Sequence, residues 1–126
     1  MRSEEALSIQ VQLEQMSGYL AARFIGVGMV KDVWQQFELL VEHCRGAKNN
    51  KLLIDTTGAE AEVSDMERFQ FGERMEIFAR CGIKVALACR PEQLHPRRYG
   101  VLLAQKRGVN VEIFTDPQDA EDWLFI

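Results

Sequence analysis

Residues 51–89 read KLLIDTTGAEAEVSDMERFQFGERMEIFARCGIKVALAC and contain a strand, a helix and a second strand in that order. The apolar run at residues 51–55 is typical of a central strand covered on both faces. Ser64 and Glu67 form a capping box, which predicts that a helix begins there. Alternation over residues 83–89 predicts the second strand. Such a strand–helix–strand unit favours parallel strands with a right-handed crossover, so this stretch predicts an α/β fold.

The segment before this unit predicts two strands and a helix. Apolar residues alternate with polar ones over residues 7–13, and a second strand over residues 19–25 follows a short turn, which favours an antiparallel hairpin. Apolar residues at helical spacing over residues 30–44 predict a helix, and we expect Gly46 to end it in the left-handed conformation. We place the end of the next strand at Asp55.

The segment after the unit continues the alternation of helices and strands. A loop with two prolines leads into a helix expected over residues 97–107, and a strand is expected over residues 109–113. Asp116 followed by Pro117 is typical of a helix start, because aspartate caps free backbone amides and proline suits the first helical position. A final helix is therefore expected at the carboxyl end of the sequence.

This order of elements predicts one α/β domain over residues 1–126. We expect a five-stranded mixed sheet in which the second to fifth strands lie side by side in sequence order as a right-handed β/α superhelix. The hairpin strand then lies at an edge. Because several strands pair an apolar face with a polar one, we expect the helices mainly on one face of the sheet. The other face, with Lys84, Asn110 and Glu112, is expected to be solvated or to make contacts.

Composition excludes several classes of protein. Three cysteines without a C-x-x-C pair argue against a disulfide scaffold and favour reduced thiols in the cytoplasm. A net charge of −4 argues against a nucleic-acid-binding domain. The sequence shows neither a signal peptide nor an apolar stretch long enough for a membrane span. We therefore expect a cytoplasmic protein without nucleic-acid partners.

Four segments resemble a known family. They are LIDTTG at residues 53–58, the pair Tyr99-Gly100, RGVNVEIFTD at residues 107–116, and the closing stretch from Ala120 to Leu124. Together they resemble the SpoIIAA-like proteins, small bacterial relatives of the STAS domain, which is the fold of the anti-sigma-factor antagonists. The same proteins are also compared with the lipid-carrying SEC14 domain. The resemblance covers nearly the whole chain and implies the superhelix predicted above, but it implies no particular reaction.

The resemblance also points to one regulatory residue. The antagonists carry a phosphorylated serine in an Asp-Ser-Ser-Gly turn at the start of the helix after the third strand, and Ser64 falls near that place. The sequence here lacks the glycine and the paired serine. Four acidic neighbours would also repel a phosphate on Ser64. We interpret Ser64 as a helix cap and keep phosphorylation, at Ser64 or at Thr57, as the alternative.

A candidate ligand site lies where the predicted parallel strands end. Helix N-termini and loops meet at this edge of an α/β sheet. The small and polar residues that follow the strands there are Gly26, Gly28, Asp55, Thr56, Thr57, Gly58 and Arg90. Such a rim suits a small polar or anionic ligand. The alternative is that Asp55 caps backbone amides and that the glycines only turn the chain.

No catalytic or metal-binding arrangement is evident. His43 and His95 lack the spacing of paired metal ligands, so we expect no metal and no other cofactor. Cys89 stands beside Arg90, and a nearby cation favours a reactive thiolate. Buried cysteines are more often packing groups, which is the interpretation we prefer. We therefore expect a protein without enzymatic activity.

Two surface features point to binding partners. Residues 60–76 carry a charge of −4 and residues 90–107 a charge of +4, a split that suits a protein partner or a second copy of the chain. The predicted helix after Ser64 has more apolar residues than one core-facing stripe needs. The first hypothesis is a non-enzymatic regulatory or scaffold domain that binds a protein partner as a homodimer through residues 55–65 and this helix. The alternative is a carrier of a lipid or small anionic ligand at the strand-end rim.

Overall fold

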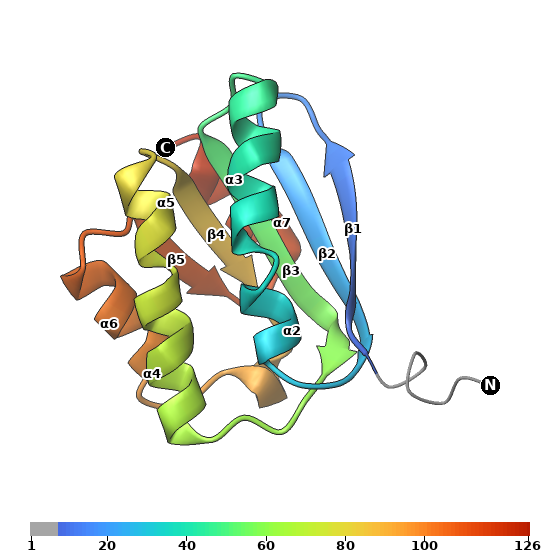
Figure 1. Cartoon of the computed structure of the whole chain (residues 1–126), viewed down its shortest axis with the longest axis vertical. Coiled ribbons are helices and arrows are strands. Elements are labelled where there is room, and N and C mark those ends of the chain that lie inside the picture. The colour runs from blue at the N-terminus through green and yellow to red at the C-terminus, as the bar shows by residue number, and fades with distance from the viewer. Residues whose placement is uncertain (1–7) are drawn as a thin grey trace.

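The computed structural model describes residues 8–126 and contains one sheet with the strand order β1-β2-β3-β4-β5 (Figure 1). The strands are β1 (Gln10–Gln15), β2 (Leu20–Val27), β3 (Lys51–Glu60), β4 (Lys84–Ala88) and β5 (Val111–Phe114). β1 pairs with β2 in antiparallel orientation, and all other pairs are parallel. The predicted mixed sheet in sequence order is therefore confirmed. Leu7, which the sequence placed in the first strand, lies outside the described residues.

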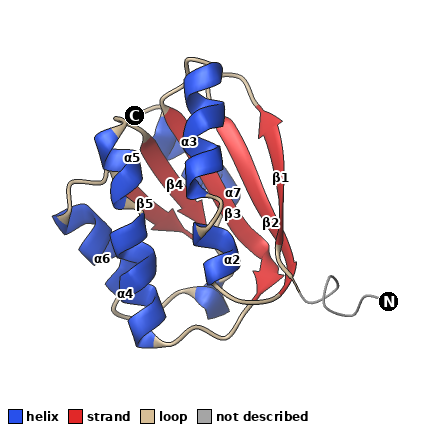
Figure 2. Ribbon diagram, viewed as in Figure 1, coloured by secondary structure: helices blue, strands red, loops and turns tan. Residues whose placement is uncertain are grey.

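Most helices cover one face of the sheet (Figure 2). They are α2 (Lys31–Trp34), α3 (Phe37–Gly46), α4 (Asp65–Arg74), α5 (Glu76–Arg80), α6 (Tyr99–Lys106) and α7 (Pro117–Leu124), with a short 3-10 helix η1 (Pro91–Gln93). α2 to α5 lie in front of the sheet in Figure 1, and α7 lies behind it. Helices mainly on one face were predicted, and this is confirmed. Among residues 8–126, no helix is long and apolar enough to cross a membrane.

The two faces of the sheet hold cores of different size. The larger core lies under the front helices and includes the fully buried Phe24, Phe78 and Leu40. On the other face, alanines of β4 make room for α7, whose Ala120 and Leu124 are fully buried there. That face was predicted to be open to solvent or to contacts, but α7 covers part of it.

The predicted helix over residues 30–44 is two helices, α2 and α3. Val33 before the break and Phe37 after it are both buried. The apolar pattern follows burial, so it continues through the break although the helical backbone is interrupted there. The prediction for Gly46 is also wrong, because Gly46 belongs to α3. In the turn after α3, the residue with positive φ is Lys48, at 53°.

β3 continues five residues beyond the predicted end at Asp55. The reason is the length of β2, which stays paired with β3 as far as Val27 opposite Glu60. A shift of register falls between Arg23 and Ile25, where a β-bulge absorbs the extra residue. Threonines before a glycine are typical of a turn, but here they lie in a strand because β2 supplies a partner for its backbone.

Two glycines allow α4 and α6 to cross in close contact. A Cβ atom at Gly72 would lie 2.5 Å from the Gly100 carbonyl oxygen, and one at Gly100 would lie 2.8 Å from the Arg68 carbonyl oxygen. Contacts this short with backbone atoms require the helices to move apart. We therefore expect Gly72→Ala to lower the free energy of unfolding by about 1 to 3 kcal/mol in urea denaturation, as overpacking does.

Gly46→Ala is the matched control for this change. Gly46 is also helical, and a Cβ atom there would meet nothing within 4 Å. Replacing glycine by alanine in an open helical position removes backbone entropy from the unfolded chain, so stability should stay equal or rise by about 0.5 to 1 kcal/mol. Equal stability of the wild type and Gly72→Ala would show that the two helices do not cross as closely as described.

Candidate functional site

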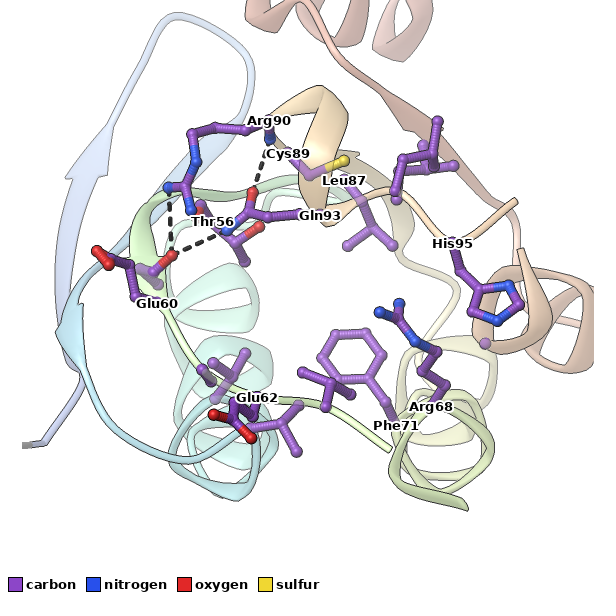
Figure 3. A pocket seen from close by; sticks show the side chains of 18 of the residues that line it. Thr56, Glu60, Glu62, Arg68, Phe71, Leu87, Cys89, Arg90, Gln93 and His95 are labelled. Atoms are coloured by element: carbon purple, nitrogen blue, oxygen red, sulfur yellow. Dashed lines mark hydrogen bonds between the residues drawn. The ribbon is translucent and has the colours of Figure 1, made fainter. Parts of the chain in front are cut away.

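A cavity of about 810 Å³ lies at the carboxyl ends of β2, β3 and β4, on the face of the sheet that the front helices cover (Figure 3). The volume falls within the roughly 300–1,000 Å³ of ordinary small-ligand sites. Its walls come from β2 to β5, from α2, α4 and α6, and from the loops that connect them. The sequence placed a candidate site at this edge of the sheet, and the cavity lies there.

The outer edge of β3 forms one wall of this cavity. β4 pairs with β3 only as far as Asp55 opposite Ala88, so the last carbonyl groups of β3 have no strand partner on this side. Side chains replace the missing strand. Gln93 Nε2 donates to the carbonyl oxygens of Thr56 (3.0 Å) and Ala59 (2.8 Å), and Arg90 Nη1 donates to Ala59 O (3.3 Å).

The same group of bonds fixes the loop after β4. The backbone N–H of Arg90 donates to Gln93 Oε1 at 2.6 Å, and its Nη1 also donates to the Thr57 carbonyl oxygen. Arg90 Nε forms an ion pair with Glu92 Oε2 at 2.9 Å. Arg90, which the sequence offered as a base for ligand binding, therefore lines the cavity with its donors already engaged.

The structure divides the seven predicted rim residues between the cavity and other places. Those that line the cavity are Gly28, Thr56 and Arg90. Those that do not are Gly26, Asp55, Thr57 and Gly58. Asp55 Oδ1 instead accepts hydrogen bonds from the backbone N–H (2.9 Å) and the hydroxyl (2.7 Å) of Thr57. Alternation up to the bulge places Asp55 on the same face as Leu53, and its bonds hold Thr57 away from the cavity that Thr56 lines.

Gly26 has a backbone role. Its φ is +120°, and a Cβ atom there would lie 2.8 Å from the carbonyl oxygen of Ser8. A residue with a side chain would be strained in this conformation and would collide with backbone. These observations favour the interpretation in which this glycine serves the backbone and not a ligand, although it lies within β2 and not in a turn.

One cavity residue, Arg68, was not singled out from the sequence as a ligand contact, whereas Phe71 is among the surplus apolar residues predicted for this helix. Arg68 and Phe71 lie three residues apart on α4 and line the side of the cavity across from β3. Figure 3 shows the Arg68 guanidinium directed into the hollow. Among the described residues, the Arg68 side chain has no hydrogen bond or ion pair. The spacing of the two residues was the available signal, because residues three apart share one helix face.

Cys89 lies in the cavity wall but is 4% exposed. Burial raises the pKa of its thiol above the ordinary value, although the charges of Arg68 and Arg90 act in the opposite direction. The raised pKa keeps the thiol protonated at neutral pH, so Cys89 is not an activated nucleophile. Within residues 8–126, no three His, Cys, Asp or Glu side chains form a group that could hold a metal ion.

Ser64 caps α4 as the sequence predicted. The Glu67 backbone N–H donates to Ser64 Oγ at 3.2 Å, and Glu67 Oε1 accepts from the Ser64 backbone N–H at 3.0 Å. The Ser64 hydroxyl also donates to Glu67 Oε1 at 3.1 Å. The side chain is exposed to solvent. Because its hydroxyl is hydrogen-bonded in the cap, a phosphate on Ser64 would break the cap. Phosphorylation of Ser64 stays a prediction.

The two oppositely charged segments face each other within the molecule. Arg107 Nη2 lies 3.3 Å from Glu73 Oε2, and Arg107 Nη1 lies 3.4 Å from Glu76 Oε1. Arg98 of the basic segment forms an ion pair with Glu112, which lies on β5. These pairs reduce the charge split that the sequence offered for a partner. The acidic residues of residues 60–76 left without an ion pair among the described residues are Glu60, Glu62 and Glu67, and Glu67 is held in the capping box with Ser64.

No family model and no curated protein matches the sequence, but solved structures do. An anti-sigma-factor antagonist from Mycobacterium paratuberculosis matches with a TM-score of 0.62 at 14% identity, over 94% of this chain and 96% of that chain. A protein from Shewanella loihica PV-4 with a SpoIIAA-like fold matches with a TM-score of 0.53 at 22% identity, over 93% and 94%. A serine-to-glutamate variant of RsbS from Moorella thermoacetica matches with a TM-score of 0.57 at 18% identity, over 92% and 95%.

The chain has the SpoIIAA-like fold. The resemblance found in four sequence segments is thereby confirmed at the level of the fold, and each match spans more than nine tenths of both chains. Within this fold, the helix α4 contributes both to the cavity, through Arg68 and Phe71, and to the exposed surface, through Met66 and Phe69.

The bonds from Gln93 to β3 should contribute to stability. Gln93→Ala removes the donors to two carbonyl groups that no strand satisfies, which should lower the free energy of unfolding by about 1 to 3 kcal/mol in urea denaturation. Gln118→Ala is the control, because the Gln118 side chain forms only exposed hydrogen bonds, and its effect should stay within about 0.5 kcal/mol. Equal effects of the two changes would contradict this role of Gln93.

The three cysteines should differ in their reaction with a thiol reagent. Cys81 is half-buried, whereas Cys44 and Cys89 are buried, and burial raises the pKa of the Cys44 thiol to about 11. Titration of the native protein with dithionitrobenzoate at pH 7.5 should show one fast thiol, which Cys81→Ser removes, and two slow ones. A fast thiol that is lost in Cys89→Ser would show an exposed, activated Cys89.

Proposed function

We propose that this chain is a non-enzymatic regulatory domain that binds a protein partner through the start of α4 and the loop before it. The observation that carries the proposal is an exposed apolar pair, Met66 at 66% and Phe69 at 40% exposure, in the first turns of this helix. Exposed apolar side chains that cluster beside charged residues are typical of protein-binding surfaces. Two of the similar structures are an anti-sigma-factor antagonist and RsbS, which supports a regulatory role.

The charges around this pair define the kind of partner. Glu60 and Glu62, in the stretch that leads to α4, are exposed and form no ion pair within the described residues. Asp65 lies 3.2 Å from His95 and is 65% exposed at its side chain. An apolar centre with an acidic border fits a partner surface that is apolar in the middle and basic around it.

The absence of enzymatic activity is part of the proposal. Cys89 was the nucleophile that the sequence offered, and its thiol is buried with a raised pKa. Association of the chain with a second copy also remains a prediction. Sedimentation equilibrium across a concentration series tests it, with a mass of twice 14.4 kDa as the expected result.

The partner surface is tested by reversing its charge. A partner is first identified by crosslinking in the source cells, and its affinity is then measured by calorimetry with the purified protein. Glu60→Lys combined with Glu62→Lys should weaken binding by about tenfold or more and reduce the salt dependence of the affinity.

The control changes the net charge by the same amount elsewhere. Glu38 and Glu42 are exposed on α3, away from this surface, so Glu38→Lys combined with Glu42→Lys should leave the affinity within about twofold of wild type. The proposal fails if both double variants bind the partner as the wild type does, or if both weaken binding equally.

A further inference from the structure

We propose that the cavity binds an amphiphilic anion, with a single carboxylate or phosphate head against Arg68 and an apolar tail between the sheet and α4. The ligand site and the partner surface meet at Glu60 and Glu62, which line the opening of the cavity, but they use different residues of α4. Along α4, Arg68 and Phe71 lie on the cavity side, whereas Met66 and Phe69 are exposed. Each of the two proposals can therefore fail without the other.

The walls of the cavity suit an apolar tail. Side chains from four strands and three helices line it, and many of them are hydrocarbon, as in Leu87, Ile113, Val33, Val101 and Phe71. The closest of these to the protein interior, Val33 and Val101, are 4% and 5% exposed. Displacing water from such walls by a hydrocarbon chain is favourable in proportion to the apolar area covered.

The charge in the cavity suits a negative head. Arg68 has no hydrogen-bond or ion-pair partner among the described residues, and Figure 3 shows its guanidinium directed into the hollow. A second observation points the same way. Arg98, which also lines the cavity, has a buried Nε atom without a hydrogen-bond partner, although its Nη2 pairs with Glu112. Buried donors without partners are rare in folded proteins, so an acceptor from a ligand is a natural complement.

The other charged groups of the cavity leave this end positive. Arg90 is engaged by carbonyl groups and by Glu92, and His95 Nε2 lies 3.2 Å from Asp65. The carboxylates of Glu60 and Glu62 lie across the opening from Arg68 and are directed away from the hollow (Figure 3). A head with one negative charge at Arg68 thus meets a free guanidinium without a carboxylate beside it.

The test uses the whole chain and isothermal titration calorimetry with defined probes. Dodecanoate and dodecyl phosphate, kept below their micellar concentrations, represent the two possible heads, and the tighter of the two identifies the head. Octanoate and acetate shorten the tail and test its contribution to affinity. Dodecanol keeps the tail but lacks the negative charge, so it tests the contribution of the charge. We expect saturable binding at one site per chain by at least one dodecyl anion, weaker binding by octanoate, and none by acetate.

The variant Arg68→Gln tests the anchor, with Arg74→Gln as its matched control. Arg74 is on the same helix, lies over the Trp34 ring at 5.4 Å and does not line the cavity. Arg68→Gln should weaken binding of the dodecyl anion by about tenfold or more, as expected for one charge-assisted hydrogen bond, and leave dodecanol unchanged. Arg74→Gln should bind like the wild type.

Several results would overturn the proposal. They are the absence of saturable binding by both dodecyl anions, equal binding of acetate and dodecanoate, and equal affinity of Arg68→Gln and the wild type. Should Arg68→Gln fail to fold, as judged by circular dichroism, Arg68→Lys takes its place. That variant keeps the charge but loses the planar group, so we expect an affinity between that of the wild type and that for dodecanol.

Discussion

The structure depends on a strand that continues beyond its neighbour. β3 pairs with β2 as far as Glu60, but β4 ends opposite Asp55, which leaves carbonyl groups of β3 on the cavity side without a strand. Unpaired backbone groups that are partly buried cost free energy, and here the side chains of Arg90 and Gln93 satisfy them. The extended β3 therefore becomes a stable wall, and the shorter β4 leaves the space that the cavity occupies.

α4 connects the two proposed binding functions. Its inner side contributes Arg68 and Phe71 to the cavity, and its outer side exposes Met66 and Phe69. The helix is held close to α6 at Gly72, where no side chain would fit. A ligand that changes the position of α4 would change the partner surface too, because both belong to one rigid element. Binding of ligand and partner would then be linked thermodynamically.

Local signals predicted several elements, although the glycine signal at Gly46 did not. The capping box at Ser64, the aspartate–proline start of α7 and the order of the five strands all follow from short-range patterns. The predicted end of β3 at Asp55 was wrong. The local sequence Thr56-Thr57 before a glycine cannot show that β2 will pair with this stretch. Alternation along the strand also places Asp55 on the face away from the cavity. The role of Arg68 depends on how α4 crosses the sheet and α6, which no local pattern reveals.

The central claim is that this domain acts by binding a protein at the start of α4. Native mass spectrometry of the chain isolated gently from its own cells tests this most directly, with Met66→Gln compared against Leu39→Gln, a change at another exposed apolar residue. The account predicts a complex with one defined partner for the wild type and Leu39→Gln, and its loss for Met66→Gln. The same partner at equal abundance in all three samples would contradict it.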